Sequence, residues 1–171
     1  MKKHKLRATV FAAALFVGIF GIGCQSAPTD AAPSLAGAWR GEVHGTSGWL
    51  AEMKGIEFMY AFNADGTMTE SSNFDAYPPG PPAYGIWRKI GARQFEAKYA
   101  VFLTKAVAIM EEFAKGNGWV PNGHGVLTQK ITLSADGNSF ESTLQFDFFD
   151  PQGKPTEGGG SATAKGERMK F

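Results

Sequence analysis

Short runs in which bulky apolar residues recur at every second position occupy most of the chain after residue 35. The clearest run extends from Ile56 to Asn63, and its bulky side chains all fall on one face, which is typical of a half-buried strand. These side chains are Ile56, Phe58, Tyr60 and Phe62. Seven further runs are expected to be strands, namely residues 39–44, 67–72, 84–89, 94–103, 126–133, 140–149 and 161–171. The sequence therefore predicts an all-β protein of about eight strands.

Turn-forming residues separate these runs. The dipeptides Asp65-Gly66 and Asp136-Gly137 predict two hairpins with the same chemistry, because glycine adopts positive φ without strain and aspartate bonds to the nearby backbone. Residues 90–93 are expected to close another hairpin, and the loop 74–82 contains four prolines, which cannot donate to a sheet ladder. The glycine run 158–160 is interpreted as a flexible turn. Antiparallel strands joined in chain order predict a single up-and-down β-barrel.

The segment from residue 104 to residue 115 fits two structures. Its apolar side chains fall on one helical face, and Glu111 and Lys115 make a favourable pair at i,i+4. The same segment also permits an alternating strand, which Glu111 interrupts. We favour a short helix around 105–115, lying across an end of the barrel, because leaving the segment out of the sheet keeps the number of strands at eight.

The first expected strand carries Gly37 and Trp39, and the last carries Arg168. This pattern resembles the lipocalin-like (calycin) barrels, and residues 62–87, with an Asp-Gly turn and a Gly-x-Trp, are similar to bacterial lipocalin-like domains. The resemblance covers most of residues 35–171 and implies one barrel domain, in which the arginine packs over the tryptophan at the closed end and ties the terminal strands together. An eight-stranded barrel fills its interior with side chains or holds one small ligand.

The first part of the chain has the pattern of a targeting signal. Residues 1–23 combine a basic start with an apolar run, which is typical of a signal peptide. The run ends in Gly-Ile-Gly before Cys24, the single cysteine, which resembles a bacterial lipoprotein box and implies acylation of that cysteine. Residues 24–34 then form a flexible tether, and Gln25 favours the outer membrane, facing the periplasm. The alternative is a plain secretory signal with an incidental cysteine.

Removal of this signal peptide changes the balance of charge. The whole chain has 17 basic and 16 acidic residues, and Lys2, Lys3, Lys5 and Arg7 lie in the signal. Thirteen basic residues then remain against 16 acids, which gives a net charge near −3. No basic cluster is interleaved with aromatic residues, so we expect no nucleic-acid partner.

Residues that usually carry catalysis or bind metals are few. After the signal peptide the histidines are His44 and His124, and a metal site would need both of them together with Glu42 or Asp75. Acid–base catalysis would use one histidine with Tyr77 or Glu42. The sequence contains no nucleophile elbow, phosphate loop or dinucleotide fingerprint. We therefore expect no catalytic residue, no metal and no cofactor.

Aromatic residues are the richest signal in the chain. Most of those that face inward are expected to be core, but four lie in or beside loops and suit the rim of a site for an apolar ligand. Together with two residues of the strands, the candidate ligand-binding residues are Trp49, Tyr60, Tyr77, Tyr84, Trp119 and His124. The alternative is that the loop aromatics only anchor their loops to the barrel end.

The leading hypothesis for function is a monomeric, lipid-anchored protein that binds a small, mostly apolar molecule or lipid in the barrel mouth without catalysis. Two alternatives stay open. One is a small-barrel enzyme of isomerase or cyclase type, which requires ionisable groups such as His44, Glu42, Asp75 or Tyr77 to meet in a cavity. The other is a filled barrel that presents its loops to a protein of the cell envelope.

Overall fold

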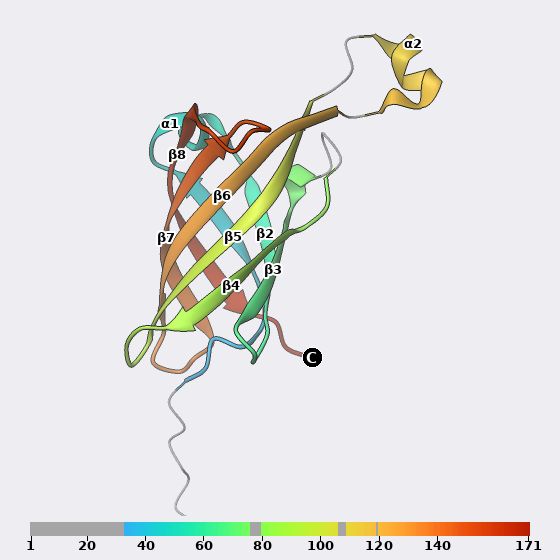
Figure 1. The fold of residues 1–171 in the computed structure, drawn as a ribbon. Coiled ribbons are helices and arrows are strands. Elements are labelled where there is room, and N and C mark those ends of the chain that lie inside the picture. The colour runs from blue at the N-terminus through green and yellow to red at the C-terminus, as the bar shows by residue number, and fades with distance from the viewer. Residues whose placement is uncertain (1–32, 76–79, 106–108, 119) are drawn as a thin grey trace, which may run out of the picture. The chain divides into compact units, whose positions relative to one another are not determined.

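The computed structural model describes residues 33–75, 80–105, 109–118 and 120–171. Eight antiparallel strands form a closed barrel, in which each strand pairs with the next and the last pairs with the first (Figure 1). The strands are β1 (Gly37–Gly45), β2 (Ile56–Phe62), β3 (Thr67–Ser72), β4 (Ala83–Lys89), β5 (Gln94–Lys105), β6 (Val120–Leu133), β7 (Ser139–Phe149) and β8 (Pro155–Arg168). The prediction of a single up-and-down barrel of eight strands is confirmed, and this topology is compatible with a lipocalin-like fold.

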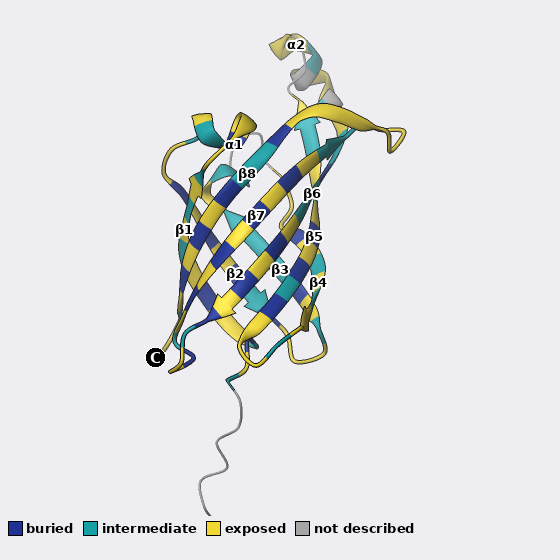
Figure 2. Ribbon diagram, turned by 90° about the vertical axis from the view of Figure 1, so that its left-hand side faces the viewer, coloured by how far each residue is buried: buried dark blue, intermediate teal, exposed yellow. Residues whose placement is uncertain are grey.

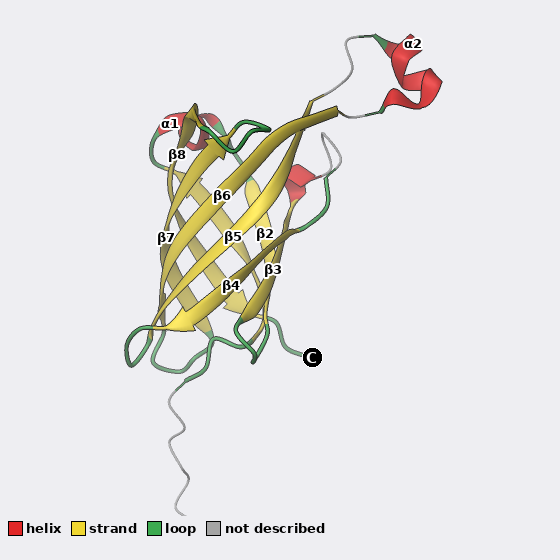
Figure 3. Cartoon of the chain, in the orientation of Figure 1, coloured by secondary structure: helices red, strands yellow, loops and turns green. Residues whose placement is uncertain are grey.

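Short helical segments lie between some of the strands (Figure 3). They are α1 (Gly48–Glu52), the 3-10 turn η1 (Asn73–Asp75), α2 (Met110–Glu112) and the π-helical turn η2 (Phe113–Asn117). Within the described part of the chain, none of the helices has both the length and the apolar character that a membrane span requires. The predicted signal peptide and Cys24 lie outside the described residues, as does all of the tether except its last two residues.

Strict alternation along the strands builds the interior of the barrel, as the bands of buried and exposed residues in Figure 2 show. In β2 the side chains of Phe58 and Phe62 are 2% exposed, whereas Met59 between them is 54% exposed. The same parity on the other strands turns large side chains into the barrel. The largest of these are Trp39, Phe62, Met68, Phe95, Tyr99, Ile131 and Leu133.

One end of the barrel, here called the closed end, is sealed by Trp39. Its ring is fully buried, its Nε1–H donates to the carbonyl of Leu35 at 2.9 Å, and the ring of Phe140 meets it edge-on. The guanidinium of Arg168 lies 4.2 Å from the ring centroid, and Arg168 is the register partner of Trp39 across the β1–β8 pair. The contact therefore joins the first strand to the last at the point where the barrel closes.

Arg168 also fixes the chain that leads into β1. Its guanidinium donates to the carbonyls of Ser34 at 2.6 Å, Ala36 at 2.7 Å and Gly137 at 2.9 Å. Gly37, at a φ of 136°, passes so close that a Cβ there would collide with the Arg168 Nη1. A glycine is required at this position because both the positive φ and the close approach exclude a side chain. Arg168 thus binds two segments that are distant from it in sequence, the chain before β1 and the turn between β6 and β7.

The segment from residue 104 to residue 115 divides between strand and helix. Thr104 and Lys105 extend β5 and pair with the start of β6, so the strand continues further than the sequence predicts. Helical structure begins only at Met110, and the side chains of Glu111 and Lys115 form the expected pair at 3.1 Å. Figure 1 draws α2 beyond the ends of β5 and β6 rather than across the barrel end.

The glycine run 158–160 belongs to β8 and is not the flexible turn that its composition suggests. All three glycines have positive φ, and the register with β7 shifts just past Phe146. A Cβ on Gly159 would collide with the carbonyl of Phe146, and one on Gly160 with the carbonyl of Ser47. The run therefore lets β8 bend while its backbone touches both β7 and the chain before α1.

The closed end makes a testable prediction. Replacing Arg168 by methionine removes three hydrogen bonds and the cation above Trp39, so the free energy of unfolding in urea should fall by about 3 kcal/mol. The matched control is Arg40→Met on β1, because Arg40 is exposed and pairs only with Glu57 at 2.9 Å, a bond worth less than about 1 kcal/mol. Equal losses in the two variants would contradict the role assigned to Arg168.

Candidate functional site

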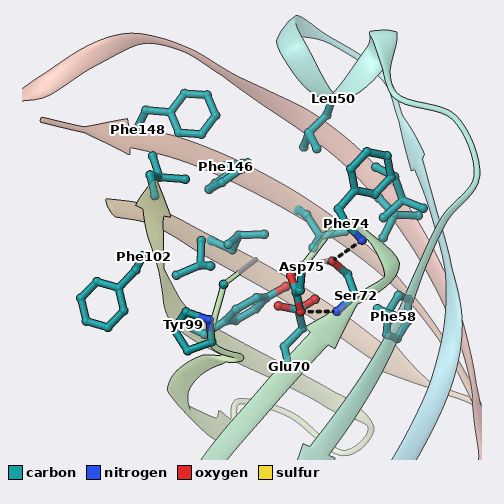
Figure 4. Close-up of a pocket in the computed structure, with 18 of the residues that line it drawn as sticks. Leu50, Phe58, Glu70, Ser72, Phe74, Asp75, Tyr99, Phe102, Phe146 and Phe148 are labelled. Carbon is teal, nitrogen blue, oxygen red and sulfur yellow. Dashed lines mark hydrogen bonds between the residues drawn. The ribbon is translucent and has the colours of Figure 1, made fainter. Parts of the chain in front are cut away.

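The half of the barrel away from Trp39 is hollow. A cavity of about 260 Å³ lies inside the sheet near the end that carries α1 and η1, here called the open end. Its walls are mostly apolar and include Leu50, Phe74, Phe146 and Phe148 (Figure 4). This volume is close to the lower limit of typical small-molecule sites. The interior is therefore filled at the closed end and able to hold a small ligand at the other.

The helix α1 supplies part of the wall at the open end. The chain before it is fixed to β8, because the amides of Thr46 and Ser47 donate to the carbonyl of Ser161 at 2.8 and 3.2 Å. This attachment directs Leu50, which is 6% exposed, into the cavity. The ring of Trp49 lies edge-on to Phe146 and Phe148, with centroids 6.0 and 5.8 Å away. Trp49 keeps 40% of its surface exposed, as expected of a residue at a rim.

A network of short hydrogen bonds fixes Asp75, at the end of η1. Its carboxylate accepts from the amide of Ser72 at 2.7 Å and from the hydroxyls of Ser71 and Ser72 at 2.9 and 3.0 Å. The Ser72 hydroxyl in turn accepts from the amide of Phe74 at 3.3 Å. This network holds the loop against β3 and leaves both Asp75 and Phe74 among the residues that line the cavity (Figure 4).

Glu70 places a carboxyl group inside the mostly apolar cavity. It shares the inner face of β3 with Met68 and Ser72, and Figure 4 places its carboxyl beside that of Asp75. Among the described residues no side chain or amide forms a hydrogen bond with the Glu70 carboxyl. Burial, with the negative charge of Asp75 in addition, raises the pKa of Glu70 to about 8. Glu70 therefore changes its charge near neutral pH.

Two tyrosines form the polar floor of the cavity. The hydroxyls of Tyr60 and Tyr99 lie 3.0 Å apart, and burial raises the pKa of both well above the usual range, so both stay neutral. Gln129 is 2% exposed, and its Nε2 donates to the Ser142 hydroxyl at 2.7 Å. Its Oε1 has no hydrogen-bond partner within the described residues. An acceptor without a donor thus remains in the polar part of the core. The Gln129 side chain also interacts with Tyr60 through a hydrogen bond.

The predicted ligand-binding residues fall into three groups. Trp49 and Tyr60 line the cavity. Tyr84 is 59% exposed on the outer face of β4, and the His124 ring stacks on Phe149 outside the cavity lining, at a centroid distance of 4.9 Å. Strand parity explains both positions, because their neighbours Ala83 and Gly125 occupy the inward positions. Tyr77 and Trp119 lie outside the described residues.

Among the described residues, the histidine and carboxyl groups considered for catalysis do not meet in the cavity. Glu42 and His44 lie on the outer face of β1, mostly exposed, with 3.8 Å between the carboxylate and Nε2. Asp75 lines the cavity on the inside of the barrel, and Tyr77 is not described. The described part of the chain also contains no group of three metal-binding side chains.

Glu70 and Tyr99 were missed as site residues by the sequence interpretation, although a signal for them exists. Each occupies an inward position of an alternating strand: Glu70 two residues after Met68, and Tyr99 two residues after Ala97. A polar side chain with inward parity must find a partner or face a cavity. The alternation of inward and outward side chains predicts the core, and it also predicts which polar residues line the cavity.

No protein-family model matches the chain, and no curated protein matches it either. The site is therefore interpreted from its own chemistry.

The raised pKa of Glu70 predicts how stability depends on pH. The folded protein keeps a proton on Glu70 up to about pH 8, whereas the unfolded chain releases it near the ordinary value of 4.5. Stability is therefore lost as the pH rises between these values, and the loss is complete above the folded pKa. The Glu70→Gln variant has no such loss, and at about pH 9 it should unfold with a free energy up to about 5 kcal/mol higher than wild type.

Chemical unfolding at about pH 5 and about pH 9 measures this difference. Near pH 5 the two proteins should have nearly equal stability. The control is Glu57→Gln, because Glu57 is exposed on the outer face of β2 and pairs with Arg40, so its removal should leave the pH slope unchanged. A Glu70→Gln variant with the same pH slope as wild type would show that Glu70 ionises normally.

Proposed function

We propose that the protein is a lipid-anchored carrier of the bacterial cell envelope, which binds a small, mostly apolar molecule in the open end of its barrel without catalysis. The observation that carries the proposal is the cavity of about 260 Å³ between a filled closed end and an apolar rim. Apolar walls with a few convergent polar groups are typical of small-molecule sites. Here the polar groups are Glu70, Asp75, Tyr60 and Tyr99.

The proposed location rests on the sequence. A basic start, an apolar run and Cys24 support acylation of that cysteine, and acyl chains hold a protein at a membrane surface without spanning it. The tether of residues 24–34 would then leave the barrel free in the periplasm. A monomer is sufficient for this role, because the described lining of the cavity comes from one chain.

An isomerase-type enzyme is the second candidate, and Glu70 is the observation that favours it. A carboxyl with a pKa of about 8 inside an apolar cavity has the properties of a general acid–base group. Carrier and enzyme differ in what happens to the bound compound. Incubating the compound extracted from the protein with wild type and with Glu70→Gln, followed by chromatography, distinguishes them, because only an enzyme converts it and only through Glu70.

The anchoring proposal predicts the effect of changing Cys24. Wild type expressed in a bacterium should sediment with the membranes, and Cys24→Ser should be released in the soluble periplasmic fraction, because the attachment point for the lipid is gone. The neighbouring change Gln25→Ser is the control and should stay with the membranes. Release of wild type into the soluble fraction would contradict lipid anchoring.

The carrier proposal predicts a captured compound. Native mass spectrometry of the Cys24→Ser protein from the periplasm should show an added mass that disappears on denaturation. Val101 lines the cavity, so Val101→Trp should fill it and lower the occupied fraction about tenfold. Its neighbour Ala100 is exposed on the outer face of β5, and Ala100→Trp should keep the full added mass. Absence of any added mass, or equal loss in the two variants, would overturn the proposal.

A further inference from the structure

The ionisable groups of the cavity have one sign. Its described lining contains two carboxyl groups, Glu70 and Asp75, and no lysine, arginine or histidine. The other titratable groups that face Glu70 are Tyr60 from β2 and Tyr99 from β5, and both stay neutral. A ligand that enters this cavity therefore meets negative charge and no compensating cation.

Glu70 presents an unpaired carboxyl to the cavity. It lines the cavity and makes no hydrogen bond within the described residues. Asp75 differs, because its carboxylate already accepts three hydrogen bonds from Ser71 and Ser72. Once Glu70 ionises, its carboxylate accepts hydrogen bonds only, so a ligand that donates hydrogen bonds suits this site.

Aromatic rings line the same cavity as the two carboxyls. Phe58 and Tyr60 stack with their centroids 4.2 Å apart, and Phe74, Tyr99 and Phe146 line the same cavity. Aromatic faces attract cations, and desolvation strengthens the attraction. A fatty acid is disfavoured in this environment, because its carboxylate would have no cationic partner and would be repelled by Asp75.

We propose that the ligand of this cavity is a protonated amine on a small apolar body, with its ammonium group between the carboxyls of Glu70 and Asp75 and its apolar part against the aromatic walls. This inference rests on the proposed carrier function and specifies its ligand class. An ammonium group supplies three donors and one positive charge, which are what the cavity lacks.

Binding of an amine is coupled to release of a proton from Glu70. In the free protein the pKa of Glu70 is about 8, so at neutral pH the carboxyl is mostly protonated and the ammonium has to displace that proton. The affinity for an amine should therefore rise as the pH increases toward 8 and level off above it, until the amine itself loses its proton. The affinity for a neutral ligand should not follow this profile.

A matched set of three compounds tests the proposal by isothermal titration calorimetry of the Cys24→Ser protein. Phenylbutylamine, phenylbutanol and phenylbutanoate share one apolar body and differ only in the head group. At about pH 8 the amine should bind about tenfold or more tightly than the alcohol, because a charge-assisted hydrogen bond replaces a neutral one. The carboxylate should bind more weakly than the alcohol.

Glu70→Gln should lower the affinity for the amine to that for the alcohol and leave the affinity for the alcohol unchanged. Glu57→Gln, which removes a carboxylate from the outer face of β2, should change neither. The pH profile of amine binding to the Cys24→Ser protein is a second readout that depends on no change to the cavity.

The outcomes separate this proposal from the carrier function. Equal binding of amine and alcohol, or tighter binding of the carboxylate, would overturn the amine class and leave the carrier function standing. An extracted natural compound without a basic nitrogen would do the same. If none of the three compounds binds and no captured mass is found, both proposals fail.

Discussion

The contact between Trp39 and Arg168 is the constraint on which the rest of the barrel depends. A sheet of eight strands has two free edges unless its first and last strands pair, and here they pair with Trp39 opposite Arg168. The guanidinium covers the ring and also holds the chain before β1 and the turn between β6 and β7. Closure at this end blocks access to the interior there, so any space left inside the barrel can open only at the other end.

The barrel divides its interior between packing and binding. Near the closed end the inward positions carry Trp39, Phe140, Leu133 and similar side chains, which leave no space. Toward the open end the same strand faces carry polar or smaller residues such as Glu70, Ser72 and Val101 among the aromatic rings, and a cavity remains. One pattern of alternation thus produces a stable core at one end and a cavity at the other, without a second domain.

The two carboxyls of the cavity lower the stability of the folded protein when no ligand is bound. A carboxyl without a hydrogen bond, beside a second carboxyl and among aromatic rings, destabilises the folded state at the pH where it ionises. Proteins keep such groups where they serve binding or catalysis. A cationic ligand removes the penalty, because it supplies both the missing donors and the missing charge, and this relation connects the stability of the barrel to its occupant.

Local patterns in the sequence predicted most of the fold. Alternation and turns located eight strands, although β6 and β8 begin earlier than predicted. The resemblance to lipocalin-like barrels implied that Trp39 and Arg168 join the terminal strands. The cavity was not predictable in this way, because it depends on which inward positions lie at the same height in the closed sheet. Tyr60, Glu70 and Tyr99 come from β2, β3 and β5, respectively, and the strand register brings them together. Strand identity follows from neighbouring residues, whereas the composition of the site follows from contacts between residues far apart in the chain.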